Sequence, residues 1–243
     1  EHARSIGITI FSSPFDETAV DLLEELDAPA YKIASFELTD IPLIKYVAKT
    51  KKPMLMSTGM ASEIEIKDAL TTARENGCEE ILLFHCISSY PAPINQANLR
   101  QMIALQEKFN VAIGLSDHTI GNAAAIAAVS LGASAIEKHF TISRKEKGPD
   151  SEFSIEPREL EQLISDANDA WNALGSPSFE RPIAEMSNKV FRRSIYFVKD
   201  LKSGHVITDE DIRRIRPGHG LPPKYFDELI GAITSTDVFR GQP

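Results

Sequence analysis

The chain has 243 residues, of which 42% are hydrophobic and 25% are charged, as is ordinary for a folded globular protein. Its formal net charge of −9 argues against a broad surface for nucleic acid or for an anionic membrane. Because no apolar run reaches the roughly 18 residues of a membrane span, and Cys78 and Cys86 form no CxxC motif, we expect a reduced, cytoplasmic protein.

Six strand–helix pairs follow one another in the first part of the chain. Short apolar runs predict strands, and apolar residues at i, i+3, i+4 and i+7 predict the helices between them. The strands are expected at 6–11, 31–34, 53–56, 80–84, 111–113 and 135–136. The helices are expected at 19–26, 41–48, 62–76, 99–109, 123–131 and 160–171. Strands that are apolar throughout are typical of a parallel sheet covered by helices.

The regular spacing of these pairs predicts most of a (β/α)8 TIM barrel. An open, doubly wound sheet is the alternative, and the lack of a glycine-rich turn after the first strand disfavours it. Six pairs are two fewer than the barrel needs, so we expect its first two strands to be missing from this chain. A barrel with two open edges is expected to be unstable or inactive by itself.

The pattern changes after residue 175. Residues 1–175 are predicted to form the partial barrel, 176–190 a linker rich in serine and proline, and 191–243 a small, C-terminally truncated domain. Within the small domain we expect a strand at 194–198, a short helix beginning at Thr208 and a strand-like run at 213–216. So small a domain buries little core and is expected to lean on a partner surface.

Two of the predicted strands end in blocks that each contain a histidine. The first block is Gly114-Leu115-Ser116-Asp117-His118-Thr119, and the second is Glu137-Lys138-His139-Phe140. If the strands are neighbours in a parallel sheet, His118 and His139 reach the same rim of the barrel. A pair of imidazoles suits a divalent metal such as Mn²⁺ or Zn²⁺.

Hydroxyl and charged side chains recur at nearly every strand end. They are Ser12, Ser13, Lys32, Ser35, Glu37, Ser57, Thr58, His85, Ser88, Tyr90, Ser116, Asp117, Glu137 and Lys138. Serine donors together with lysine suit a phosphate and a carboxylate. The residues alone therefore suggest a metal-dependent barrel enzyme that acts on a phosphorylated, carboxylated substrate and a carbonyl compound.

Structural roles are the alternative for each of these residues. A strand-end serine is often a helix cap, His118 by itself suits a buried structural histidine, and His85 suits a contact with a neighbouring strand. Cys86 suits a small buried apolar position, and Asp150 suits a turn.

Several motifs, in order along the whole chain, resemble the sialic acid synthase (NeuB-like) family. They are Ser12-Ser13-Pro14-Phe15-Asp16, Lys32-Ile33-Ala34-Ser35-Phe36-Glu37, Ser57-Thr58-Gly59-Met60, the two histidine blocks and Gly148-Pro149-Asp150. The tail from Arg193 to Gly218 resembles the family's antifreeze-like SAF domain, a β-clip fold. The resemblance implies a transferase that condenses phosphoenolpyruvate with an N-acylated amino sugar.

Two stretches resemble the branch of the family that makes pseudaminic acid. They are Ala34-Ser35-Phe36-Glu37 and Gly148-Pro149-Asp150-Ser151-Glu152-Phe153-Ser154. The resemblance implies 2,4-diacetamido-2,4,6-trideoxy-L-altrose as the sugar. The N-acetylneuraminate and legionaminate branches are alternatives, and a non-catalytic sugar-binding protein is a remote one.

The same resemblance implies a role for each site residue. His118 and His139 would bind the metal, Mn²⁺ in the first place, with Mg²⁺ or Co²⁺ as alternatives. The phosphate ligands would be Ser13, Ser35, Ser57 and Ser116. Lys32 would bind the carboxylate of phosphoenolpyruvate together with Ser88, which stands where neuraminate enzymes have asparagine.

The sugar side of the site is implied in the same way. Tyr90 and Asp150 would contact the amino sugar, and Glu37 would act as acid or base near the reacting carbons. Arg216 would reach the N-acyl group from the other subunit of a domain-swapped homodimer.

Overall fold

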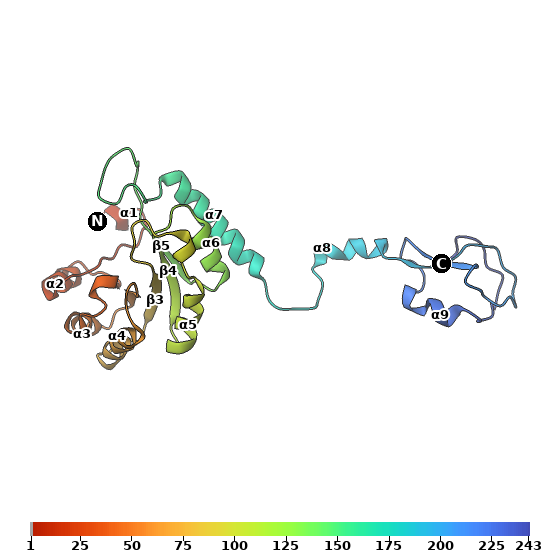
Figure 1. Cartoon of the computed structure of the whole chain (residues 1–243), viewed down its shortest axis with the longest axis horizontal. Helices are drawn as coiled ribbons and strands as arrows, with labels where there is room; N and C mark the ends of the chain where they lie inside the picture. The colour runs from red at the N-terminus through yellow and green to blue at the C-terminus, as the bar shows by residue number, and fades with distance from the viewer. Residues whose placement is uncertain (1) are drawn as a thin grey trace. The chain divides into compact units, whose positions relative to one another are not determined.

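The computed structural model describes residues 2–243, and the chain divides into two compact units, Glu1–Gly175 and Ser176–Pro243. The first unit contains five parallel strands in the order β1-β2-β3-β4-β5 (Figure 1). Their bounds are Tyr31–Ile33, Met54–Ser57, Ile81–Cys86, Ala112–Asp117 and Ala135–Lys138. Sequential strands are therefore spatial neighbours, as expected for βα repeats.

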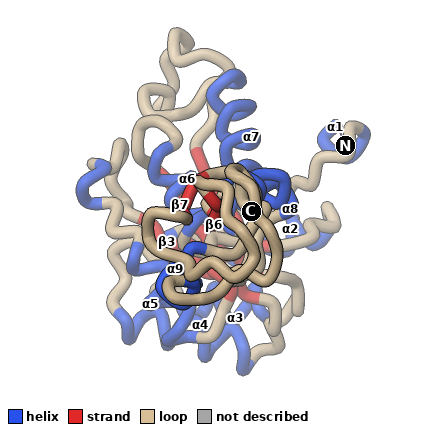
Figure 2. The backbone as a smooth tube through the Cα atoms, turned by 90° about the vertical axis from the view of Figure 1, so that its right-hand side faces the viewer, coloured by secondary structure: helices blue, strands red, loops and turns tan. Residues whose placement is uncertain are grey.

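Helices precede, connect and follow these strands, and the longer ones cover the sheet. Their bounds are α1 His2–Ser5, α2 Glu17–Glu25, α3 Ile41–Ala48, α4 Glu63–Glu75, α5 Arg100–Phe109, α6 Ala123–Ser130 and α7 Pro157–Leu174, with 3-10 turns η1 Ser35–Glu37 and η2 Ile94–Gln96. The start of α4 is fixed by the capping box that Ser62 and Glu65 form, which satisfies backbone N–H groups that the helix leaves free. Figure 2 shows α3, α4 and α5 in a row beneath the sheet.

The core of the first unit lies between the sheet and these helices. Tyr31, Ile33, Met54, Met56 and Leu83 are completely buried on the strands. The helices present Ile44, Val47, Leu70 and Met102 to the same core, which explains why the strands are apolar throughout. This parallel, helix-covered sheet confirms the predicted barrel-type α/β fold. Among residues 2–243, no helix has the length and apolar character to cross a membrane.

The predicted strand at 6–11 is wrong. Residues 6–7 form a turn after α1 and residues 8–11 belong to no strand, and one isolated parallel bridge joins Ser12 to Tyr31. Ile6, Ile8 and Ile10 are more than half exposed, so no partner surface covers this apolar run in the structure. Apolar character alone predicted a strand, but a strand also needs a continuous hydrogen-bonded neighbour.

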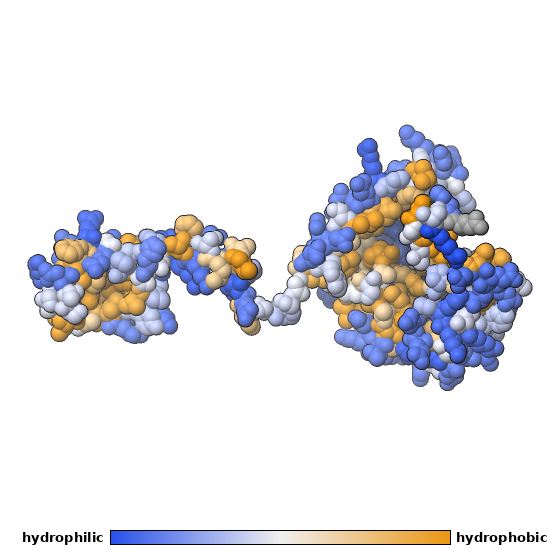
Figure 3. All heavy atoms as spheres, turned by 180° about the vertical axis from the view of Figure 1, so that it is seen from behind, coloured by the Kyte–Doolittle hydropathy of each residue, from blue (hydrophilic) through white to orange (hydrophobic). Residues whose placement is uncertain are grey.

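The apolar face predicted for the last helix of the first unit is only partly buried. Leu163 on α7 is buried, and it packs with Ala125 and Ile155. Ile164 is 54% exposed and Trp171 is 63% exposed, so no described residue fully covers this part of the apolar face. Figure 3 shows apolar atoms on the visible face of each unit, with polar atoms around them.

The second unit is built around a two-stranded antiparallel sheet. Its elements are α8 Ile183–Met186, η3 Ser187–Phe191, β6 Ser194–Phe197, β7 Ile212–Ile215, η4 Pro223–Tyr225 and α9 Phe226–Leu229. Ile195, Ile207 and Ile212 form its small core. The stretch predicted as a linker contains α8 and η3, so it is not wholly irregular.

The short helix predicted at Thr208 is a turn. The Asp211 carboxylate accepts hydrogen bonds from the Thr208 backbone N–H at 2.9 Å and from its hydroxyl at 2.7 Å. The chain then enters β7 at Ile212, so the residues that resemble a helix cap close a single turn.

Candidate active site

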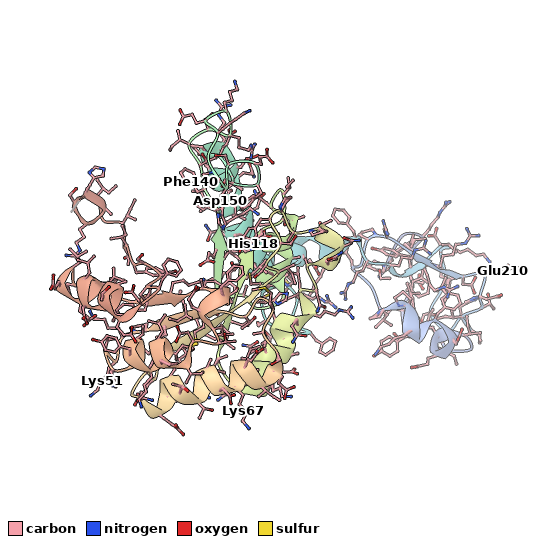
Figure 4. All side chains as sticks on the ribbon, turned by 60° about the vertical axis from the view of Figure 1, so that its left-hand side comes forward. Lys51, Lys67, His118, Phe140, Asp150 and Glu210 are labelled. Atoms are coloured by element: carbon pink, nitrogen blue, oxygen red, sulfur yellow. The ribbon has the colours of Figure 1, made fainter. Side chains whose placement is uncertain are left out.

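Polar side chains gather at the carboxyl ends of the five parallel strands. Figure 4 shows His118 and Asp150 at this end, while Lys51 and Lys67 lie on the helical side of the unit. Parallel strands bring their carboxyl ends to one rim, so residues that are far apart in sequence meet there.

The ends of β4 and β5 are matched over three successive positions. Ser116 is paired with Glu137 in the sheet register, and its hydroxyl donates to Glu137 Oε1 at 2.7 Å. Asp117 is paired with Lys138, and the two form a buried ion pair of 2.8 Å. His118 and His139 come next, with ring centroids 5.2 Å apart. Because side chains alternate along a strand, the serine–glutamate and histidine pairs share one side and the ion pair lies on the other.

Lys32 is the cationic centre of the rim. Its Nζ donates to Ser57 Oγ at 2.7 Å and lies 3.3 Å from Glu137 Oε2. Lys32 is only 8% exposed, and its ammonium lies 5.5 Å from the centre of the Phe84 ring. The predicted anion ligands Lys32, Ser57 and Ser116 therefore form one connected cluster through Glu137.

Ser35, Gly59 and Ser88 form a tight corner next to this cluster. The Gly59 backbone N–H donates to Ser35 Oγ at 3.2 Å. A Cβ atom at Gly59 would lie 2.1 Å from Ser88 Oγ and 2.7 Å from Ser35 Oγ. Both predicted ligands thus occupy space beside residue 59 that is free only because this residue is glycine.

The two histidines are oriented by polar partners at Nδ1. His118 Nδ1 lies 3.0 Å from the Ile87 carbonyl oxygen, and His139 Nδ1 lies 3.4 Å from Asp150 Oδ2. An imidazole that donates from Nδ1 presents Nε2 as its lone-pair nitrogen, which is the usual arrangement of a metal-binding histidine.

The protonation of these groups reflects burial and their neighbours. Burial lowers the pKa of His118, but hydrogen bonds to Cys86 and to the Ile87 carbonyl outweigh it and leave the pKa raised. Burial, followed by the charge of His118, lowers the pKa of His139. Burial raises the pKa of the Cys86 thiol, but hydrogen bonds from His118 and Ser35 outweigh it and leave the pKa lowered.

The donor set fits a divalent metal in part. His118 and His139 offer two nitrogen ligands on adjacent strands, each with the second partner that metal-bound histidines usually have. Within residues 2–243, no group of three or more His, Cys, Asp or Glu side chains is arranged around one point. A metal here would therefore need water or substrate oxygens to complete its coordination.

Two aromatic rings frame the histidines. The Tyr90 ring lies 4.4 Å from the His118 ring, and the Phe153 ring lies 4.9 Å from the His139 ring, measured between centroids. Phe153 comes from the loop that also supplies Asp150, so this loop folds back over the rim. Tyr90 is 46% exposed, so part of this residue is open to a ligand.

Three predicted site residues stand apart from these contacts. Glu37 lies on η1, and its Oε2 atom is buried without a hydrogen-bond partner among the described residues. Ser13 is half-buried and follows Ser12, whose carbonyl accepts from the Lys32 backbone N–H at 3.1 Å. Arg216 is exposed in the second unit, at the end of β7.

Sequence reasoning assigned no role to Glu137, Cys86 or Phe153 in the site. Glu137 lies two residues before His139, so the two side chains are expected on the same side of the sheet. This spacing was the sequence signal that could have placed Glu137 in the site. Cys86 is buried, as expected for an apolar position, but its Sγ also lies 3.8 Å from His118 Nδ1. No helix or strand periodicity could have predicted that Phe153 lies in the site, because this residue belongs to a loop.

His85 has a structural contact. Its Nε2 lies 2.8 Å from the carbonyl oxygen of Ala97, and the side chain is buried. Burial lowers the pKa of His85, and the contact with Ala97 offsets only part of that effect. The imidazole is thus used to hold the loop after β3 against the sheet.

The rim of this parallel βα sheet carries a cluster of anion-binding donors beside paired imidazoles. Such a site is typical of a barrel-type enzyme that acts on anionic substrates. Comparison with known proteins gives the family. Residues 1–178 match the model of the NeuB family, and residues 192–243 match that of the SAF domain. The chain belongs to the NeuB family and is a synthase of the sialic acid synthase type, whose members condense phosphoenolpyruvate with a sugar.

Individual relatives agree with this assignment. The chain is 41% identical to the pseudaminic acid synthase of Helicobacter pylori, over 100% of this chain and 72% of that protein. It is 38% identical to the N,N'-diacetyllegionaminic acid synthase of Campylobacter jejuni, over 96% of this chain and 71% of that protein. The crystal structure of the spore coat polysaccharide biosynthesis protein SpsE from Bacillus subtilis has a TM-score of 0.69 and 31% identity, over 99% of this chain and 73% of that one.

Proposed function

We propose that this chain is a pseudaminic acid synthase that condenses phosphoenolpyruvate with 2,4-diacetamido-2,4,6-trideoxy-L-altrose and releases phosphate. The observation that carries the proposal is the cluster of Lys32 with Ser57 and Ser116, placed beside the paired imidazoles. A buried ammonium with hydroxyl donors suits an acid that carries both a carboxylate and a phosphate.

The choice of sugar rests on local sequence, because 41% and 38% identity do not separate the two kinds of relative. Phe36 stands between Ser35 and Glu37 on η1 and is 64% exposed. An exposed phenyl ring next to predicted substrate ligands suits a sugar that lacks a hydroxyl at C6, which argues against the neuraminate branch and is compatible with both branches that use 6-deoxy sugars. The loop from Gly148 to Ser154 supplies Asp150, which contacts His139 and is the predicted ligand of the amino sugar.

In the reaction, C3 of phosphoenolpyruvate forms a bond to the aldehyde carbon of the open-chain sugar. Water adds at C2, and phosphate then leaves by cleavage of its C–O bond. Lys32 holds the carboxylate and Ser13, Ser35, Ser57 and Ser116 hold the phosphate, which orients C3 toward the aldehyde. A divalent cation at His118 and His139, with Mn²⁺ the first choice, would supply Lewis-acid polarisation of the sugar carbonyl.

Glu37 is proposed as the acid–base group of this sequence. Its buried Oε2 atom has no hydrogen-bond partner among the residues that the structure describes, so it is available to exchange a proton with substrate or water. A buried carboxylate oxygen without a partner costs stability, and a catalytic role is one reason for a protein to keep such an atom.

We infer that the working enzyme is a homodimer in which Arg216 of one subunit serves the barrel of the other. The exposure of Arg216 and the small core of the second unit support this arrangement. Mixing two inactive variants, Arg216→Ala and His118→Ala, should restore part of the activity, because mixed dimers contain one intact site. Mixtures that stay inactive, although dimers exchange subunits, would contradict shared sites.

The deciding experiment is a sugar comparison with this protein, phosphoenolpyruvate and Mn²⁺. The altrose-configured sugar should give phosphate release and a nine-carbon product, whereas the sugars used by neuraminate- and legionaminate-forming enzymes should react much more slowly. In ¹⁸O-labelled water the label should enter the product and not the phosphate. Faster turnover of another amino sugar would assign the chain to that branch.

A further inference from the structure

We propose that Glu137 is a built-in anion that holds the phosphoenolpyruvate ligands in place while the site is empty and gives way when the substrate binds. The inference rests on the proposed function, because it takes Lys32, Ser57 and Ser116 as ligands of that substrate. It assigns to Glu137 a positioning role that sets the affinity for phosphoenolpyruvate.

The contacts of the Glu137 carboxylate resemble those of a bound anion. Oε1 accepts from the Ser116 hydroxyl at 2.7 Å, and Oε2 lies 3.3 Å from the Lys32 ammonium. Lys32 in turn donates to Ser57 at 2.7 Å. The Glu137 carboxylate, on β5, therefore contacts donors from β1 and β4 directly, and Lys32 extends the cluster to Ser57 on β2.

The contact with Glu137 gives the Lys32 ammonium a counter-charge while no substrate is bound. A buried ammonium without a counter-charge is costly, and its side chain would take other positions to reach water. With Glu137 as its partner, Lys32 stays at the rim, close to the geometry in which it would receive a substrate carboxylate. The donors are thus arranged before the substrate arrives.

The two partners differ in their freedom to move. The Lys32 side chain is 10% exposed, whereas the Glu137 side chain is 38% exposed. Lys32 is also restrained by the Ser57 hydroxyl and the Phe84 ring. Glu137 is therefore the partner that rotates toward water, and Lys32 is the one that stays.

The consequence is a competition between the Glu137 carboxylate and the substrate. Two negative groups a few ångströms apart repel in a partly hydrated site, and both need the same ammonium. If Glu137 loses its charge but keeps its shape, the substrate should bind more tightly. A residue that only braces the fold would behave in the opposite way, since its replacement loosens the donors and weakens binding.

The test compares three variants with the unmodified protein by calorimetric titration with phosphoenolpyruvate, and separately with inorganic phosphate, at one pH. Glu137→Gln keeps an oxygen for Ser116 and should bind phosphoenolpyruvate about fivefold more tightly or better. Glu137→Asp keeps the charge on a shorter side chain and should not show this gain. Glu152→Gln removes an exposed charge from the Asp150 loop and should change the affinity by less than about twofold.

A steady-state measurement adds a second readout. Glu137→Gln should lower KM for phosphoenolpyruvate and leave KM for the sugar unchanged, and circular dichroism should show a native fold. Equal or weaker binding of phosphoenolpyruvate by a folded Glu137→Gln variant would overturn this inference and leave the proposed function intact. No binding of phosphoenolpyruvate to the unmodified protein would overturn both. If Glu137→Gln does not fold, Glu137→Met takes its place because it also removes the charge: tighter binding by the folded variant supports the competition, and unchanged or weaker binding contradicts it.

Discussion

Lys138 Nζ lies 2.8 Å from Asp117 Oδ2, and the two side chains are 4% and 1% exposed. Each of these residues comes directly before one of the paired histidines, on neighbouring strands. Lys138 also donates to the Thr119 carbonyl at 2.8 Å, and the Thr119 backbone N–H donates to Asp117 Oδ1 at 2.9 Å. The ion pair thus ties the end of β5 to the turn after β4 and keeps His118 beside His139.

Removal of one charge from this pair should destabilise the protein. Lys138→Met leaves Asp117 as a buried, uncompensated carboxylate, and the expected loss in the free energy of unfolding is about 3–5 kcal/mol. The double variant Asp117→Asn with Lys138→Met should lose less, because no buried charge remains. Urea unfolding curves measure both, and a double variant less stable than Lys138→Met would contradict the pairing.

Loss of either predicted metal ligand should weaken metal binding. His118→Ala and His139→Ala should each lower the affinity for Mn²⁺ by about tenfold or more, and Asp150→Asn should lower it by about ten- to a hundredfold through the orientation of His139. The affinity is measured by titrating metal-free protein with Mn²⁺ and monitoring free Mn²⁺ by its electron paramagnetic resonance signal. His85→Gln is the matched control and should bind the metal normally. Unchanged affinity in both alanine variants would exclude the imidazole pair as the site.

Gly59→Ala should impair substrate binding more than folding. The new Cβ would meet the Ser88 and Ser35 hydroxyls, which can rotate away, so the fold should survive while two predicted ligands are displaced. We expect KM for phosphoenolpyruvate to rise about tenfold, equivalent to roughly 1.4 kcal/mol of binding, with a thermal midpoint close to that of the parent. Ser88→Ala in the same chain removes the closer contact and should recover part of the loss. An unchanged KM would show that this corner does not contact the substrate.

His85 should make stability depend on pH. Its pKa is lowered in the folded state, mainly by burial, so below about pH 6.5 the unfolded chain gains a proton that the folded protein does not. Stability due to this group is therefore complete above the unfolded pKa and falls as the pH drops below it. His85→Gln retains a donor for the Ala97 carbonyl and should flatten the decline in the urea midpoint between pH 7 and pH 5. An identical decline in the variant would assign it to other groups.

Local signals were enough to predict much of the first unit. The capping residues Ser62 and Glu65 mark the start of α4, and buried apolar runs mark the five strands that pair in sequence order. The positions of Lys32 and Ser57 at strand ends were also readable, since parallel strands bring their ends to one rim.

Other features depend on contacts that the sequence does not announce. The run at 6–11 has strand composition, but pairing requires a neighbouring backbone, and the single bridge at Ser12 is all that forms there. Phe153 reaches His139 through the path of a loop, and the cap-like Thr208 closes a turn because Asp211 is close enough to satisfy it. In each case tertiary context decides between local structures of similar propensity.

The matched ends of β4 and β5 also limit how this enzyme can vary. Asp117 and Lys138 support the histidines from one side of the sheet, whereas Ser116 and Glu137 face the anion ligands on the other. An insertion or deletion of one residue before either block affects the ion pair and the histidines together, because it turns every later side chain of that strand to the opposite side of the sheet. Directed evolution can therefore use point mutations in these blocks. A change in strand length would instead place an ion-pair residue where a histidine now lies and abolish the site in a single step.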